Sequence, residues 1–253
     1  MLDGPWGTRL ALVAIGLCTL VRGAAAVEDI GRAEIVIETV RGTLDGRERR
    51  LDARDPVFHD EEIETGATSA SEIRLRDDTR LTIGPSSRVV LDDFVLDADA
   101  SRQRLVIALG RGVLRFVTGT LAKTAYEIRT PTAVIGVRGT TVTLSVDADG
   151  TTRIRVEDGG VEAANLAGVA VEVEAGFATV IAAAGGTPPP PSPPAPLDGE
   201  AAPEIGRMDD LIAAAAPGED ADTGRETGPA LDPGRRDAIG SKSDKKGPNG
   251  GPY

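Results

Sequence analysis

The chain has 253 residues, of which 40 are acidic and 28 basic, and its net charge at neutral pH is −12. A protein of this charge repels polyanions and anionic lipid surfaces, so nucleic acid is not expected as a partner. The sequence contains one histidine, one cysteine and one tryptophan, and aromatic residues make up only 3%. This composition disfavours zinc sites, which need several His or Cys ligands, and sites that stack bases or sugars on aromatic rings.

Residues 1–26 have the features of an export signal. A positive charge precedes an apolar run over residues 10–21, and alanines supply small side chains before the cleavage point. We therefore expect cleavage between Ala26 and Val27, and a mature chain in the periplasm, outside the cell or at the cell surface. The apolar run is shorter than the roughly 20 residues of a membrane span, so no integral membrane span is expected after cleavage. A lipid on Cys18 is the alternative for this segment.

Residues 27–185 are expected to form one all-β domain. Short runs alternate apolar and polar residues, which is the period of a strand with one buried face, and Gly, Pro or Asp separates them. The pattern leaves open a solenoid-like or a sandwich arrangement of these short strands. The expected strands are residues 35–40, 73–75, 81–83, 89–91, 105–109, 113–117, 126–128, 142–146, 154–156, 169–173 and 177–181.

The clearest hairpin joins the runs 142–146 and 154–156 through the turn 147–150. Asp and Gly in the turn favour the backbone angles that a tight hairpin requires. The alternation places Val142 and Leu144 in the core, and Thr143 and Ser145 in water.

The C-terminal part differs in composition. Residues 186–198 are rich in proline and predict a stiff, extended linker. Residues 199–253 are acidic and polar, and predict a disordered tail, so the stability of the domain should not depend on the chain from residue 187 onwards. Within the tail, residues 204–216 predict a short helix, either transient or a docking peptide for a partner. Its apolar face would carry Ile205, Met208, Leu211 and Ile212.

No catalytic, cofactor-binding or metal-binding residue is predicted. The single histidine, His59, lies in a polar loop and has no nucleophile motif to serve. Two groups of aspartates could supply oxygen ligands to calcium, but turn formation explains both better. They are Asp92, Asp93, Asp97 and Asp99, and Asp147 and Asp149.

Several segments together resemble the FecR domain. Residues 55–92 resemble its first half, and residues 108–119 and 128–146 its second half. Residues 156–163 and 173–181 resemble its closing strands, so that the resemblance runs from about residue 33 to residue 181. The second half includes a Gly-Val-x-Gly-Thr element, formed here by Gly136, Val137, Arg138, Gly139 and Thr140.

The resemblance implies a role for the domain. Iron-responsive FecR proteins are membrane-spanning regulators, in which a cytoplasmic segment controls a sigma factor and the periplasmic part receives a signal. We expect here an exported, non-enzymatic β-domain without the anti-sigma segment. Its partner would be another envelope protein, such as a membrane receptor or regulator, and its oligomeric state stays open. A structural or adhesive surface protein is the first alternative, and a carboxylate-dependent hydrolase is the second.

The family element is expected to be structural. Gly136 and Gly139 would allow tight turns or close backbone approach. Arg138 could pair with a carboxylate at the turn or contact a partner, and we favour the structural role.

Overall fold

A computed structural model describes residues 28–183, 189–197 and 203–215. The expected cleavage site at Ala26 and Val27 lies outside the described residues, as does the chain beyond residue 215. Strands dominate the described part, which confirms the all-β class. Among the described residues, no helix has the length and apolar character needed to cross a bilayer.

The strands form two sheets that share one long strand, β9 (Arg104–Val117). Sheet A has the order β4–β1–β6–β7–β9–β12–β13–β16–β17. Its other strands are β4 (Pro56–Phe58), β1 (Asp29–Ile37), β6 (Ala70–Leu75), β7 (Arg80–Ile83), β12 (Thr141–Val146), β13 (Thr152–Asp158), β16 (Phe177–Ile181) and β17 (Ala195–Pro196).

Sheet B has the order β3–β2–β5–β8–β9–β10–β11–β14–β15. Its other strands are β3 (Arg47–Arg50), β2 (Val40–Leu44), β5 (Glu62–Thr65), β8 (Arg88–Val95), β10 (Tyr126–Arg129), β11 (Ala133–Val137), β14 (Gly160–Asn165) and β15 (Ala170–Glu174). Among the described strands, only β9 and β10 pair in parallel.

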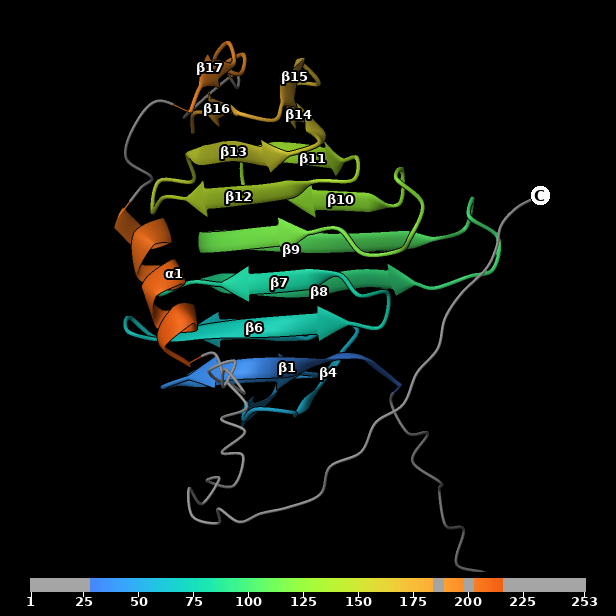
Figure 1. Cartoon of the computed structure of the whole chain (residues 1–253), viewed down its shortest axis with the longest axis vertical. Helices are drawn as coiled ribbons and strands as arrows, with labels where there is room; N and C mark the ends of the chain where they lie inside the picture. The colour runs from blue at the N-terminus through green and yellow to red at the C-terminus, as the bar shows by residue number, and fades with distance from the viewer. Residues whose placement is uncertain (1–27, 184–188, 198–202, 216–253) are drawn as a thin grey trace, which may run out of the picture. The chain divides into compact units, whose positions relative to one another are not determined.

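From β6 onwards the chain adds strands to the two sheets in turn. The hairpin β6–β7 belongs to sheet A, β10–β11 to sheet B, β12–β13 to sheet A and β14–β15 to sheet B. The strands therefore stack in chain order, as the change of colour from blue to orange shows in Figure 1. The fold is a sandwich that also grows stepwise along the chain, so it combines the two arrangements that the sequence left open.

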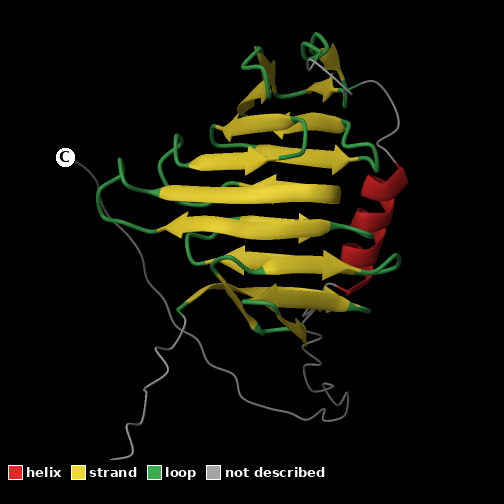
Figure 2. Cartoon of the chain, turned by 180° about the vertical axis from the view of Figure 1, so that it is seen from behind, coloured by secondary structure: helices red, strands yellow, loops and turns green. Residues whose placement is uncertain are grey.

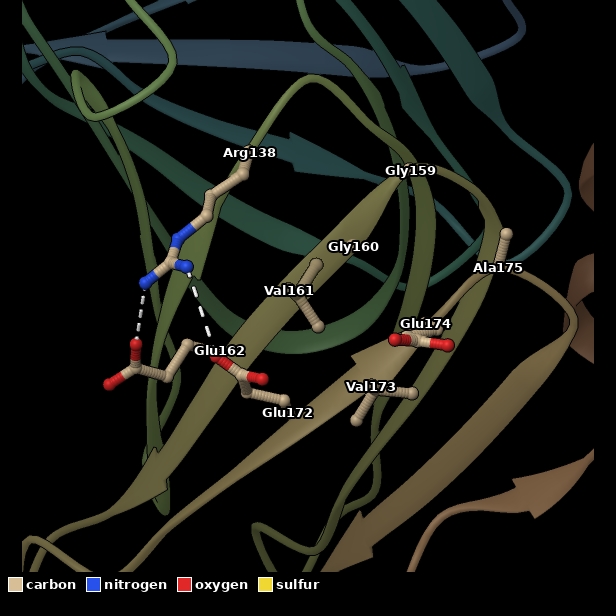
Figure 3. A pocket seen from close by; sticks show the side chains of 9 residues that line it. All are labelled: Arg138, Gly159, Gly160, Val161, Glu162, Glu172, Val173, Glu174 and Ala175. Atoms are coloured by element: carbon tan, nitrogen blue, oxygen red, sulfur yellow. Dashed lines mark hydrogen bonds and ion pairs between the residues drawn. The ribbon is translucent and has the colours of Figure 1, made fainter.

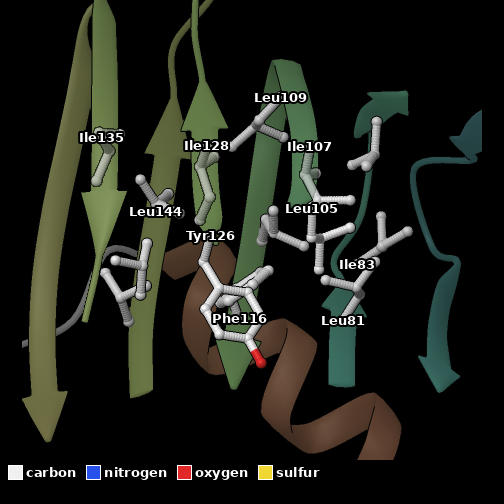
Figure 4. Packing of buried hydrophobic residues seen from close by; sticks show 14 of the residues in the cluster. Leu81, Ile83, Leu105, Ile107, Leu109, Phe116, Tyr126, Ile128, Ile135 and Leu144 are labelled. Carbon is white, nitrogen blue, oxygen red and sulfur yellow. The ribbon is translucent and has the colours of Figure 1, made fainter. Parts of the chain in front are cut away.

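The inner faces of the two sheets form one hydrophobic core. Figure 4 shows Leu81, Ile83, Phe116 and Leu144 of sheet A among residues of sheet B. The rings of Phe116 and Tyr126 meet edge to face at 5.8 Å between centroids, which joins the sheets near the middle of the stack.

The strand prediction failed at the places where the chain changes sheet. The expected strand 35–40 is divided between β1 and β2, at Glu38, whose φ is +58°. The expected strands 105–109 and 113–117 are one strand, β9, which passes from sheet B to sheet A at Gly112. The expected separation of these two runs by a glycine is therefore wrong, because the chain continues as one strand through Gly110 and through Gly112, whose φ is +89°.

The hairpin of β12 and β13 is confirmed, with Leu144 opposite Ile154 and Gly150 at a φ of +90°. Its outer face is not solvated as expected, since Thr143 is 1% exposed and Ser145 is 7% exposed. Thr143 is covered from the neighbouring strands, because its hydroxyl accepts a bond from Arg115 Nε and donates to Glu157. The polar residues of an alternating pattern mark the outer face, and here the side chains of Arg115 and Glu157 on that same face cover Thr143.

The proline-rich segment is hydrogen-bonded to the domain rather than a free spacer. Strand β17 pairs with β16. Ser192 donates its backbone N–H to Val180 O at 2.9 Å, and Val180 donates back to Ser192 Oγ at 2.8 Å. A proline-rich strand suits this position, because a sheet edge does not require every backbone N–H to donate.

Helix α1 (Pro203–Ala215) confirms the predicted helix but differs from the prediction of a disordered tail over these residues. Ile205 is 4% exposed and Met208 is fully buried, because both pack in a cluster with Val113 of β9. The helix lies beside strands of sheet A in Figures 1 and 2. Leu211 and Ile212 are half-buried. The sheet provides the apolar contact that the isolated segment lacks, which composition alone does not show.

Candidate protein-interaction surface

The family element forms a turn between the two sheets, and Thr140 fixes it. Thr140 is 2% exposed, and its hydroxyl donates to Gly160 O at 2.8 Å while its backbone N–H donates to Thr118 Oγ1 at 3.0 Å. Gly139 and Gly159 have φ values of +69° and +75°, and a Cβ on Gly159 would lie 2.2 Å from Gly139 O. The two glycine turns thus pack directly against each other, which a side chain on Gly159 would prevent.

The two residues that precede the turn belong to β11. Val137 is 1% exposed and lies in the core. Gly136 faces outward, pairs with Glu127 and Glu162, and has no atom within 4 Å of the position a Cβ would take. The expected turn or close approach at Gly136 is therefore wrong, and the conformational requirement lies at Gly139 alone within this element.

Arg138 extends from the turn over the outer face of sheet B, as Figure 3 shows. Its Nη2 lies 2.8 Å from Glu162 Oε2, and its Nη1 lies 3.8 Å from Glu172 Oε1. The Arg138 side chain is 56% exposed and that of Glu172 is 75% exposed. Exposed ion pairs of this kind contribute only about 0–1 kcal/mol, so these contacts orient Arg138 more than they stabilise the domain.

The surface continues from Arg138 across β11, β10 and β9. Val134 is 38% exposed, although it lies in the middle of the sheet. Open depressions lie on both sides of Arg138, one lined by β14 and β15 and the other floored by Gly136. We call this region the motif surface; it comprises Arg104, Lys123, Glu127, Val134, Gly136, Arg138, Glu162 and Glu172.

The motif surface has the chemistry of a protein contact. Basic and acidic side chains alternate around a small apolar centre, and the glycine leaves the sheet backbone accessible. Alternating charge of this kind gives orientation and specificity to a partner, and an apolar centre provides the area that is desolvated on binding. The sequence pattern singles out Arg138, although it favours a structural role for this residue. It does not indicate Glu162, Glu172 or Val134, because cross-strand neighbours depend on the register of the sheet.

Of the residues considered for metal binding or catalysis, the structure brings His59 and Asp93 together, with His59 Nε2 3.6 Å from Asp93 Oδ1. His59 Nδ1 lies 2.8 Å from Asp60 Oδ2 in an exposed loop. Asp92 pairs with Arg129 and Asp93 with Arg104. Within the described ranges, no group of three or more His, Cys, Asp or Glu side chains is arranged to hold a metal ion.

The remaining aspartates have local structural roles. Asp97 and Asp99 accept bonds within their own loop, the latter from Ser101. Asp147 pairs with Arg153, and Asp149 accepts the N–H of Thr151 at 2.8 Å in the hairpin turn. Bonds from the Thr151 backbone and hydroxyl lower the pKa of Asp149.

Comparison with known proteins identifies the domain. A family described as FecR protein matches residues 61–162. The chain contains a FecR domain. The FecR match runs from the start of β5 to β14 and includes the whole Gly-Val-x-Gly-Thr element, but it is narrower than the resemblance drawn from sequence.

Two solved structures are similar to this chain. Both are crystal structures of a proposed anti-sigma factor from Parabacteroides distasonis ATCC 8503, at 13% identity, with TM-scores of 0.42 and 0.41. The similarity covers 52% of this chain and 58% of theirs, so the chain spans less than two thirds of their length. No curated protein matches the sequence.

Proposed function

We propose that the protein is an exported, non-enzymatic regulatory module, and that its FecR domain binds another envelope protein through the motif surface. The partner would be a membrane receptor or regulator in a signalling or assembly pathway. The observation that carries the proposal is the position of Arg138. The FecR match includes it, Gly139 and Thr140 hold its turn rigidly, and its guanidinium is presented to solvent.

The geometry around Arg138 supports binding. The rigid turn lowers the entropy cost of ordering this side chain when a partner binds. A partner carboxylate could replace Glu172, whose distance to the guanidinium is 3.8 Å, without disturbing the closer pair with Glu162. Alternating charge also favours correct orientation of the encounter over high affinity, as suits a regulated contact.

Site-specific photo-crosslinking in intact cells would test the proposal. A photoreactive amino acid replaces Val134 on the motif surface, and in a matched control it replaces Arg153 on sheet A. We expect one envelope protein to be captured from position 134 and not from position 153. The Arg138→Glu change should remove that product while the melting temperature stays nearly unchanged.

The outcomes separate the alternatives. Equal capture from both positions would indicate non-specific proximity and contradict the motif surface as the site. Recovery of the protein in the cytosolic fraction would contradict export. Capture of the same partner by the Arg138→Glu variant would show that Arg138 is not part of the contact.

A further inference from the structure

Helix α1 occupies a docking site on the outer face of sheet A. The site is formed by Gly84, Val113 and Arg115, and we call it the seat. Met208 is fully buried there, against Val113, which is 1% exposed. A Cβ on Gly84 would lie 3.2 Å from the Cβ of Met208 and equally close to that of Val113. The glycine therefore leaves room for an apolar side chain from a helix.

A charged group lies beside the apolar part of the seat. The Arg115 guanidinium contacts both carboxylate oxygens of Asp209, with Nη2 to Oδ2 at 3.1 Å. Arg115 Nε donates to Thr143 Oγ1 at 3.2 Å, so the guanidinium is held in place from the sheet side. A bidentate guanidinium in a partly buried position is selective for a carboxylate. The seat thus recognises two apolar residues three positions apart and an acid directly after the second.

The sequence of α1 forms only a marginally stable helix when it is isolated in water. The helix has 13 residues and contains Gly206 in its first half. A helix this short is marginal on its own in water, and an internal glycine weakens it further. Among the described side chains of α1, only Ile205 and Met208 are buried, so its docking rests on few apolar contacts and on the pair of Asp209 with Arg115.

The seat and its cover belong to different parts of the chain. Gly84, Val113 and Arg115 all lie within residues 61–162, which match the FecR family, whereas α1 lies outside that range. The residues that hold Met208 and Asp209 therefore lie within the matched range, although α1 also contacts β1 outside that range.

We propose that this seat is a second interaction site, which α1 blocks in cis and which a helix of a partner protein fills in trans. The partner helix is amphipathic, with two apolar residues three positions apart and Asp or Glu immediately after the second. The site lies on sheet A, whereas the motif surface lies on sheet B, so either can fail without the other.

A peptide-binding measurement on the full-length protein tests this. The probe is a fluorescent, capped peptide with the sequence of residues 203–215, measured by anisotropy against the wild type and two released variants. Met208→Asp expels the chain's own helix from the apolar seat, and Asp209→Arg expels it through repulsion by Arg115. We expect both variants to bind the peptide at least about tenfold more tightly than the wild type, because the tethered competitor has been removed.

Charge exchange gives the matched control. Arg115→Glu, added to the Met208→Asp chain, should weaken binding of the peptide about tenfold or more, and a peptide with Asp209→Arg should restore it. A second peptide keeps only the two apolar residues and the acid on an Ala-Glu-Lys helix. If this second peptide binds to the released variants and its scrambled form does not, the result would support a partner helix as the occupant of the seat.

Three results would overturn the proposal. The first is equal binding to the wild type and the released variants. The second is binding of the α1 peptide but not of the pattern peptide, which would make the seat specific for the chain's own helix. The third is exchange of α1 between two copies, seen as a concentration-dependent dimer, which would make a second copy the occupant.

Discussion

A Cβ on Gly112 would lie 2.5 Å from the Cα of Ser87. The strand β9 passes at this point from sheet B to sheet A, and Gly112 has a φ of +89°. The Ser87 hydroxyl closes the crossing, because Val113 donates its backbone N–H to Ser87 Oγ at 2.8 Å. The junction of the two sheets thus depends on one glycine and on one buried serine.

Replacing Gly112 with alanine should lower the free energy of unfolding by about 3 kcal/mol or more, through steric overlap and an unfavourable φ. Chemical denaturation of both proteins would measure it. The matched control is Gly168→Ala, because Gly168 has a φ of +81° but no atom within 4 Å of its Cβ position. That change should cost only about 1 kcal/mol. Equal losses would mean that backbone strain, and not the contact with Ser87, sets the cost.

The sequence predicts local structure here better than long-range structure. The β12–β13 hairpin was predicted because the alternation and the Asp-Gly turn are read within a few residues. Strands β11 and β14 were missed because each contains small residues, and their identity as strands depends on pairing with each other. Gly110 and Gly112 are equivalent in sequence, and the fold distinguishes them by the positive φ of Gly112 and by its contact with Ser87.

The same distinction applies to the candidate sites. Arg138 could be selected from its motif, whereas Glu162 becomes its partner only through the register of β11 and β14. The apolar face of α1 was also visible in the sequence. Its seat was not, because Gly84, Val113 and Arg115 come from separate segments that the fold brings together.

Because of the contact between Tyr126 and Asp77, the stability of the domain should fall at alkaline pH. The Tyr126 hydroxyl donates to Asp77 Oδ2 at 3.1 Å and accepts the N–H of Leu121 at 2.9 Å. Burial first, and the Asp77 charge second, raise the pKa of Tyr126 to about 12. The folded protein keeps the phenol proton to a higher pH than the unfolded chain, whose tyrosine pKa is about 10.

The contribution of Tyr126 to the free energy of unfolding should therefore be constant below pH 10 and fall by about 2 kcal/mol between pH 10 and 12. Denaturation at several pH values would show this fall. Tyr126→Phe should cost about 1–3 kcal/mol at neutral pH, since it leaves the Leu121 N–H unpaired, and should remove the alkaline fall. The same fall in both proteins would assign it to other groups.

Glu61 should make the stability of the domain depend on pH in the acidic range. It is fully buried, and its carboxylate accepts bonds from Arg49 Nε at 3.0 Å and from the Phe58 N–H at 3.0 Å. Burial nevertheless raises the pKa of Glu61, with Arg49 as the main opposing influence. The folded state thus takes up a proton at a higher pH than the unfolded chain.

The contribution of this proton to stability is complete below the unfolded pKa of about 4.3 and is lost as the pH rises through the higher pKa of the folded state. Relative to Glu61→Gln, the wild type should gain stability as the pH falls through the raised pKa of Glu61. Parallel denaturation series of the two proteins would measure the difference. A difference that is constant, or that shrinks in acid, would show that the pair with Arg49 outweighs burial.

The stability of the domain should depend on α1, contrary to the expectation from composition. Met208→Ala should cost about 2–3 kcal/mol, because a fully buried side chain loses its contacts with Val113. Ile212→Ala is the control, since Ile212 is only half-buried, and should cost about 1 kcal/mol or less. If neither change alters the melting temperature, α1 is not docked in solution.

Arg138 should matter for binding and not for folding. Its pairs with Glu162 and Glu172 are more than half exposed on the arginine side, so Arg138→Glu should change the free energy of unfolding by less than about 1 kcal/mol. The double change Arg138→Glu with Glu162→Arg restores an ion pair with the charges exchanged. If Arg138 were structural, this exchange would recover stability that the single change had lost. If it contacts a partner carboxylate, stability stays near that of the wild type throughout, and crosslinking from position 134 remains absent in the double variant because the partner still faces a glutamate.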